Sequence, residues 1–137
     1  MAHQRLRQFN TKKTYPEQQL DNDMCHAVVA RGTYVFLRGQ TPQIIETAED
    51  VGIGDPVAQT HQVMQNIKQM IEESGGAMEH LTKLTVYLTD IRHRDAVYQT
   101  MGSYIKGVFP VCTGVVVVAL ARPTWLVEIE GVAVIPD

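Results

Sequence analysis

The stretch "TWLVEIEGVAVIPD", residues 124–137, has the composition of a β-strand, because β-branched and small apolar residues dominate it. Successive side chains of a strand point to opposite faces of the sheet, so residues two apart share a face. Glu128 and Glu130 therefore lie on one face, which they share with Leu126, Val132 and Val134. Two carboxylates on an apolar face indicate either a strand end that reaches water or a carboxylate placed in a pocket.

The rest of the chain fits one globular domain over residues 1–137, with 45% hydrophobic and 20% charged residues. No apolar run approaches the roughly 20 residues of a membrane span, and residues 1–10 lack the apolar core of a signal peptide. The cysteines, Cys25 and Cys112, are therefore expected to be reduced in a cytoplasm. The formal net charge of −3 argues against a dedicated nucleic-acid binder.

The amino-terminal half has mainly strand patterns. We expect a short edge strand over residues 4–9 and a polar loop up to Asp23. Residues 24–30 and 33–39 then predict a β-hairpin around the turn at Arg31 and Gly32.

Two helices are predicted in the second half of the chain. Asp55 and Pro56 begin the first one, as N-cap and first-turn proline, and Gly75 with Gly76 ends it. Apolar residues at helical spacing predict a second helix over residues 97–108, before Pro110. Strands are expected at residues 81–90, 112–121 and 125–134. The order β-β-β-α-β-α-β-β predicts an α+β fold, with both helices on one face of a mixed sheet.

The second face of that sheet also needs a cover. Most of the predicted strands carry apolar or small residues on both faces, and two helices hide only one of them. We therefore expect the sheet to pack against copies of itself in a closed homo-oligomer. The alternative is a monomer that tolerates an apolar surface.

Several kinds of chemistry have no support in the sequence. The five histidines are scattered without metal-ligand spacing, and no nucleotide-binding loop or G-x-S-x-G motif is present, so we expect neither a metal nor a cofactor. Cys25 and His26 are neighbours in a strand and point to opposite faces, which disfavours a catalytic pair. Cys112 is either a nucleophile with an unidentified base or, as we favour, a buried thiol.

Three segments together resemble the Rid family. They are "GQTPQ" at residues 39–43, "ESGGAMEHLTKLTVYLTD" at residues 73–90 and "VEIEGVAV" at residues 127–134. This family comprises YjgF-type reactive-intermediate deaminases, also described as L-PSP endoribonucleases, and the resemblance covers residues 24–134. It implies a chorismate-mutase-like fold and a homotrimer whose three sheets line a central barrel. It also implies small-molecule pockets at the subunit interfaces.

The resemblance identifies the first glutamate of "VEIE", Glu128, as the candidate catalytic residue. In deaminating members this carboxylate lies in the interface pocket, where it orients a water molecule and serves as acceptor or general base. Gly39, Gln40 and Pro110 also match the family pattern, and Gly39 and Gln40 are implied to line the pocket. Glu130 has no such counterpart, and we expect an ion pair or a solvated strand end there.

Other positions depart from the family pattern. Cys112 stands where deaminating members carry an arginine that grips the substrate carboxylate, and a thiol cannot form that bidentate contact. Met24 falls at the position of a pocket tyrosine, and Arg38 at that of a pocket serine. Both remain candidate substrate-binding residues, together with Cys112.

Arg38 has two interpretations. Its guanidinium either reaches into the cleft and replaces the missing anion clamp, or it lies at the rim and pairs with Glu128 or Asp90. Arg122 is a less favoured substitute for the clamp, because a loop before the last strand is expected to lie in solvent.

Two function classes remain open on the sequence. The first is an enzyme that hydrolyses a small reactive enamine or imine. The second is a non-catalytic trimer that binds a small metabolite or accompanies another enzyme. An endoribonuclease is a third possibility drawn from the older family name, although the sequence supplies neither a histidine pair nor a basic groove for it.

Overall fold

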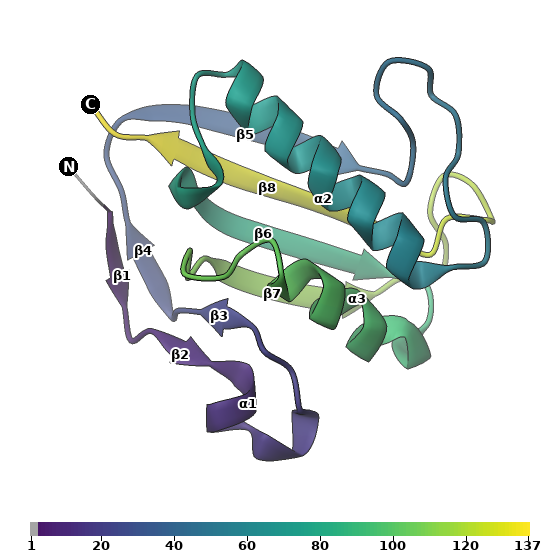
Figure 1. Cartoon of the computed structure of the whole chain (residues 1–137), viewed down its shortest axis with the longest axis horizontal. Coiled ribbons are helices and arrows are strands. Elements are labelled where there is room, and N and C mark those ends of the chain that lie inside the picture. Colours follow the sequence, from purple (N-terminus) through teal and green to yellow (C-terminus); the bar gives the residue numbers. More distant parts are fainter. Residues whose placement is uncertain (1–2) are drawn as a thin grey trace.

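A computed structural model describes residues 3–137 of the chain. Its centre is a four-stranded mixed sheet in the order β5-β8-β6-β7 (Figure 1). The last strand, β8, is antiparallel to both of its neighbours, whereas β6 and β7 are parallel. The strands are β5 (Thr33–Gln40), β6 (Leu81–Leu88), β7 (Val111–Val116) and β8 (Val127–Ile135).

Both long helices lie on the same face of this sheet (Figure 1). Helix α2 (Pro56–Glu73) crosses β5 and β8, and α3 (Arg94–Gly102) packs beside it. The Asp55 side chain caps α2 by accepting hydrogen bonds from the backbone N–H groups of Val57 (3.0 Å) and Ala58 (3.1 Å). Gly75 follows α2 with a φ of 92°, a conformation that favours glycine. The predicted α+β fold, with one mixed sheet and two helices on one face, is confirmed.

The core lies between the sheet and these two helices. Alternate residues of β6 and β8 point into it, as the period of two requires. Its fully buried members include Leu84, Val86, Val127 and Ile129 from the sheet, and Met64, Ile67, Ile71 and Met101 from the helices.

The amino-terminal segment differs from the prediction. The strand expected over residues 4–9 is divided into β1 (Gln4–Leu6) and β2 (Phe9–Asn10), because Arg7 adopts a left-handed conformation with a φ of 54°. The expected polar loop also contains a short helix, α1 (Thr11–Thr14), and a 3₁₀ turn, η1 (Pro16–Gln18).

The predicted hairpin of residues 24–30 and 33–39 is wrong. The first arm forms two short strands, β3 (Asp23–Met24), which pairs with β2, and β4 (Ala27–Val29), which pairs with β1. The second arm is β5, which pairs with β8 instead. At Gly32 the chain has a φ of 139° and passes so close to Ile135 that an added Cβ would lie 1.9 Å from the Ile135 carbonyl oxygen. This close approach directs β5 along the carboxyl-terminal strand.

Other elements are shorter than predicted. The strand expected to reach residue 121 ends at Val116, and the helix expected to reach residue 108 ends at Gly102. Positive φ angles at Gly107 (74°) and Phe109 (58°) are incompatible with a continuing helix. The remaining 3₁₀ turns are η2 (Met78–His80) and η3 (Ile91–His93).

The sheet face opposite the helices is open in the single chain. Tyr34 and Phe36 on β5 are 56% and 76% exposed, and Val115 on β7 is 41% exposed. No helix within residues 3–137 is long and apolar enough to cross a membrane. The predicted packing of this face against copies of the chain stays a prediction.

Candidate functional site

The candidate site is a hollow of about 420 Å³ at the end of β5, where the loop after β5 and the loop before β8 lie at the same end of the sheet (Figure 1). One part of its lining is polar and comes from the ends of β5 and β8, from α2, and from Thr41 and Gln43 in the loop after β5. The other part is apolar and comes from the two loops. The lining residues are Arg38, Gly39, Gln40, Thr41, Gln43, Ile44, Ile45, Ala48, Asn66, Ala121, Trp125 and Glu128.

Glu128 lies directly against the backbone of β5. A Cβ added to Gly39 would be 2.0 Å from Glu128 Oε2, so only glycine leaves room for the carboxylate. The register between β5 and β8 shifts between Leu37 and Gln40, and such bulges redirect side chains locally. The irregular strand end and the missing side chain together create the place for this carboxylate.

The electrostatic surroundings of Glu128 favour its neutral form more than water does. Burial raises the pKa of the Glu128 carboxyl, and the negative charge of Glu130 raises it further. The positive charge of Arg38 opposes both effects and lowers this pKa. Arg38 is exposed and acts as a nearby charge, since the ion pairs within 4.0 Å among residues 3–137 do not include it.

Asp90, one of the two partners proposed for Arg38, and Arg122, the less favoured clamp, are each paired with another residue. Asp90 pairs with Arg92 at 2.6 Å, which contributes to holding the pKa of Asp90 well below its usual range. Arg122 pairs with Asp50 at 3.1 Å. The prediction that Arg38 pairs with Asp90 is therefore wrong, and Arg38 is the arginine that lines the hollow.

Glu130 has a different partner from those predicted. The Tyr87 hydroxyl on β6 donates a hydrogen bond to the Glu130 carboxylate, and this bond is the main cause of the raised pKa of Tyr87. The expected ion pair or solvated strand end is replaced by a cross-strand hydrogen bond.

The structure does not place the other predicted substrate-binding residues in this hollow. Cys112 faces α3 and the Tyr98 side chain, and burial is the main cause that raises the pKa of the Cys112 thiol to about 11. The same face of β7 is so close to α3 that a Cβ on Gly114 would lie 1.9 Å from the Tyr98 hydroxyl. Met24 is 8% exposed and belongs to the core. The residues brought together are Arg38, Gly39, Gln40 and Glu128.

The sequence interpretation missed the loop and helix residues of the hollow. Asn66 on α2 is 2% exposed and donates to the carbonyl oxygens of Thr41 (3.2 Å) and Gln43 (2.7 Å), which fixes the loop after β5. An asparagine among the apolar residues of a predicted helix face was the available signal. Trp125 is the only tryptophan in the chain, and its position gave no comparable signal.

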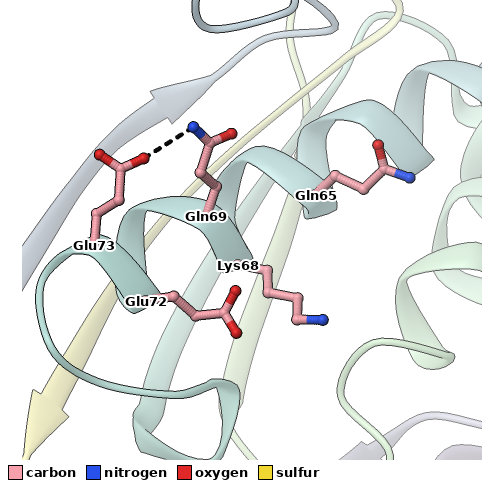
Figure 2. Close-up of a pocket in the computed structure, with 5 residues that line it drawn as sticks. All are labelled: Gln65, Lys68, Gln69, Glu72 and Glu73. Atoms are coloured by element: carbon pink, nitrogen blue, oxygen red, sulfur yellow. Dashed lines mark hydrogen bonds between the residues drawn. The ribbon is translucent and has the colours of Figure 1, made fainter.

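A second depression, of about 370 Å³, lies on the outer face of α2 (Figure 2). Its side chains all project from this one helix, and Gln69 donates to Glu73 at 2.9 Å. They are Gln65, Lys68, Gln69, Glu72 and Glu73. This is an ordinary solvated helix face, without groups that converge from a second element. Within the described part of the chain, no cluster of three or more histidine, cysteine or acidic side chains is arranged to hold a metal ion.

Comparisons with known proteins agree with this architecture. Residues 21–135 match the family model described as endoribonuclease L-PSP. Protein DfrA of Myxococcus xanthus is 39% identical over 106 residues, which cover 77% of this chain and 79% of that protein. A RutC family protein of Pyrococcus abyssi is 34% identical over 102 residues, or 74% of this chain and 79% of the relative.

Solved structures give the same result. The Rid family protein YyfB of Yersinia pestis superposes with a TM-score of 0.79 at 27% identity, covering 98% of this chain and 100% of that one. RidA of an Antarctic Psychrobacter has a TM-score of 0.69 at 32% identity, with coverage of 78% and 85%. The chain therefore belongs to the Rid (YjgF) family, which the endoribonuclease L-PSP model describes.

Proposed function

We propose that this protein hydrolyses small reactive imines, or the enamines that tautomerise to them, to a carbonyl compound and ammonia. The oxygen of a water molecule bonds to the imine carbon as the water loses a proton, and the π electrons of the C=N bond move to nitrogen, which takes up a proton. In the resulting carbinolamine the hydroxyl proton is transferred to nitrogen, the C–N bond breaks as the C=O bond forms, and nitrogen leaves as ammonia. One water is consumed, and no oxidant or reductant is required.

The observation that carries this proposal is the position of the Glu128 carboxylate, which lies in the hollow over Gly39 with its pKa raised by burial. A carboxylate of raised pKa is a better proton acceptor near neutral pH than an exposed one. In our proposal Glu128 orients the water and accepts its proton. Arg38, the cation that lines the same hollow, binds the anionic group of the substrate.

We further propose a homotrimer in which the open sheet faces form the interior of a barrel. The exposed apolar side chains of Tyr34, Phe36 and Val115 support this assembly, because a face of this kind is normally covered by protein. Each hollow would then be completed by a neighbouring subunit. A cytoplasmic location stays a prediction.

A second candidate is a trimer that binds a small metabolite without transforming it. It is favoured by the absence of the usual pocket arginine, since Cys112 stands at that position and its thiol faces Tyr98. The distinction between the two candidates depends on whether the chain accelerates imine hydrolysis.

The test generates imino acids with an L-amino-acid oxidase and follows their disappearance by semicarbazide trapping. Wild type should lower the steady-state imine level below that set by spontaneous hydrolysis, and heat-denatured protein should not. Because imines also hydrolyse unaided, an acceleration of about 10²–10⁴-fold is expected from positioning and a modest base.

The variants assign the roles in this reaction. Arg38→Ala should mainly raise KM, because it removes binding of the anionic group, whereas Glu128→Gln should mainly lower kcat. Arg92→Ala is the matched control for loss of an exposed arginine, since Arg92 pairs with Asp90 away from the hollow. If wild type accelerates no imine tested, the metabolite-binding candidate replaces the deaminase.

A further inference from the structure

We infer that Trp125, held in place by Asp50, is a specificity-determining wall of the hollow, and that the preferred ligand is a 2-imino or 2-oxo acid with an uncharged apolar side chain. This inference rests on the proposed function for the reaction, although the binding preference can be measured without catalysis. It is carried by the division of the lining into a polar and an apolar part.

The polar part accounts for the groups that every 2-imino acid shares. Arg38 and Glu128 both line the hollow, and in our proposal Arg38 would bind the anionic group while Glu128 would hold the water at the reacting centre. The side chain of the ligand is then left with the apolar part, which consists of Ile44, Ile45, Ala48, Ala121 and Trp125. A charged ligand side chain placed there would lose water without gaining a partner. An apolar side chain would gain by leaving water.

The Trp125 side chain is held by two neighbouring residues, Asp50 and Arg122, which also pair with each other. Its indole Nε1 donates to Asp50 Oδ1 at 3.0 Å, and Arg122 donates to the same carboxylate at 3.1 and 3.2 Å. The Arg122 guanidinium also lies over the indole ring, 5.3 Å from its centroid. The hydrogen bond from Trp125 is the main cause that lowers the pKa of Asp50, so the carboxylate is charged at neutral pH. Trp125 is only 7% exposed and presents a defined part of its surface to the hollow.

The two loops that carry the wall are locked to each other by one buried side chain. Gln59 on α2 is 1% exposed and donates to the carbonyl oxygens of Gly52 (3.1 Å) and Thr124 (3.0 Å). It also accepts a hydrogen bond from the backbone N–H of Leu126 at 2.8 Å. The loop after β5 and the loop before β8 therefore form one preorganised surface.

The loop after β5 is also stabilised by hydrogen bonds within the loop. Its backbone N–H groups at Ile44 and Ala48 donate to the carbonyl oxygens of Glu49 (3.0 Å) and Ile44 (2.8 Å). The Gln43 side chain donates to the Ala48 carbonyl oxygen at 2.9 Å. Ala48, which lines the hollow, has a φ of 60°, a conformation rare for residues other than glycine. A fixed wall of this kind selects ligands by shape as well as by polarity.

The first experiment measures binding by the fluorescence of Trp125. Because Trp125 is the only tryptophan of the chain, its emission reports directly on the proposed wall. Wild type is titrated with 4-methyl-2-oxopentanoate, pyruvate and 2-oxoglutarate, which are stable and share the 2-oxo acid group. We expect 4-methyl-2-oxopentanoate to bind about tenfold more tightly than pyruvate, because an apolar pocket discriminates by roughly this factor. Equal or tighter binding of pyruvate or 2-oxoglutarate would overturn the inference.

The second experiment compares kcat/KM for the imines derived from leucine and alanine. Wild type should prefer the leucine imine, and Trp125→Ala should lose most of that preference, whereas Trp125→Phe, which keeps an apolar ring but loses the N–H bonded to Asp50, should keep only part of it. Asp50→Ala should resemble Trp125→Ala, and the conservative Asp50→Asn, which still offers an oxygen to the indole, should restore the preference. If Trp125 and Asp50 served only folding, their replacement would lower kcat/KM for both imines in parallel and leave the ratio unchanged. That result would contradict a role of Trp125 in specificity.

Ile45→Ser tests the apolar lining without a risk of misfolding, because Ile45 is 38% exposed and does not belong to the buried core. It should weaken 4-methyl-2-oxopentanoate binding and lower the leucine-to-alanine ratio, with the circular dichroism spectrum unchanged. Imine hydrolysis without side-chain preference would overturn this inference and leave the proposed function intact. Selective binding without any hydrolysis would support the wall and overturn the deaminase.

Discussion

At the scale of single residues, the site depends on a glycine as much as on its charged groups. The Glu128 carboxylate occupies the space that any side chain at residue 39 would need. Its pKa is set by burial and by two neighbouring charges of opposite sign, Arg38 and Glu130. Each of these contacts makes a prediction that a single substitution can test.

Gly39→Ala should displace the carboxylate. The new Cβ would lie 2.0 Å from Oε2, so the Glu128 side chain must rotate out of its place over β5. We expect imine hydrolysis to fall about as far as in Glu128→Gln, and overpacking of this kind costs about 1–3 kcal/mol of stability. Thermal unfolding measures the second effect. The double variant Gly39→Ala/Glu128→Ala removes the clash and should recover most of that stability; a double variant no more stable than Gly39→Ala would contradict this packing.

The pH dependence follows from the direction of the Glu128 shift. A carboxylate that must be ionised to accept a proton is active above its pKa and loses activity as the pH falls through it, so a raised pKa moves this loss to higher pH. Arg38 lowers the pKa of Glu128, and Arg38→Ala should therefore move the acid limb of kcat/KM further upward. Both proteins are measured with the same imine, so that titration of the substrate cancels. An acid limb unchanged by Arg38→Ala would show that the two groups do not interact.

At the scale of elements, the sequence predicts best where signals are local. The N-cap at Asp55 and the glycines after residue 74 predicted α2 correctly, because each acts within one helical turn. The hairpin prediction failed because the partner of β5 is the carboxyl-terminal strand, about a hundred residues away, and the signal that selects it is the close contact of Gly32 with Ile135.

The same difference between local signals and contacts of distant residues explains which residues of the candidate site could be predicted. Arg38, Gly39, Gln40 and Glu128 were predicted through the resemblance of short motifs to a family. The family pattern at residue 112 did not reveal that β7 presents Cys112 to α3. Trp125 is held at the hollow by its hydrogen bond to Asp50, and the loop after β5 is held there by hydrogen bonds from Asn66. Such tertiary contacts cannot be predicted from the periodicity of the sequence.

We expect the packing of β7 against α3 to make the thiol of Cys112 unreactive. With a pKa of about 11, about one thiol in a thousand is ionised at pH 8, and only the thiolate reacts with alkylating agents. Iodoacetamide should therefore modify Cys112 at least about 100-fold more slowly in the native protein than in urea. Peptide mapping separates Cys112 from Cys25. Cys112→Ala should leave imine hydrolysis within about a few-fold of wild type, and complete loss of activity would restore the nucleophile hypothesis.

At the scale of the whole molecule, one side of the sheet lacks a cover in the single chain. Phe36 is 76% exposed in the centre of β5, on the face away from both helices. We expect sedimentation equilibrium near micromolar concentration to give about three times the chain mass. Phe36→Asp should give a monomer with an unchanged circular dichroism spectrum, because this side chain contributes little to the core of its own chain.

Ile91→Asp is the matched control for this experiment. Ile91 is 62% exposed in η3, outside the open sheet face, and its replacement should leave the trimer intact. A wild-type monomer at micromolar concentration would contradict both the barrel and the completion of each hollow by a neighbour.

The most direct test of the proposed chemistry compares two glutamates of one strand. Glu128 and Glu130 lie two residues apart on the same face of β8, but only Glu128 lines the hollow, whereas Glu130 accepts a hydrogen bond from Tyr87. The measurement is kcat for hydrolysis of the leucine-derived imine by Glu128→Gln and by Glu130→Gln. We predict a loss of about 10²–10⁴-fold for Glu128→Gln, and for Glu130→Gln a rate within a few-fold of wild type. Equal rates for the two variants would contradict the assignment of Glu128 as the group that activates water.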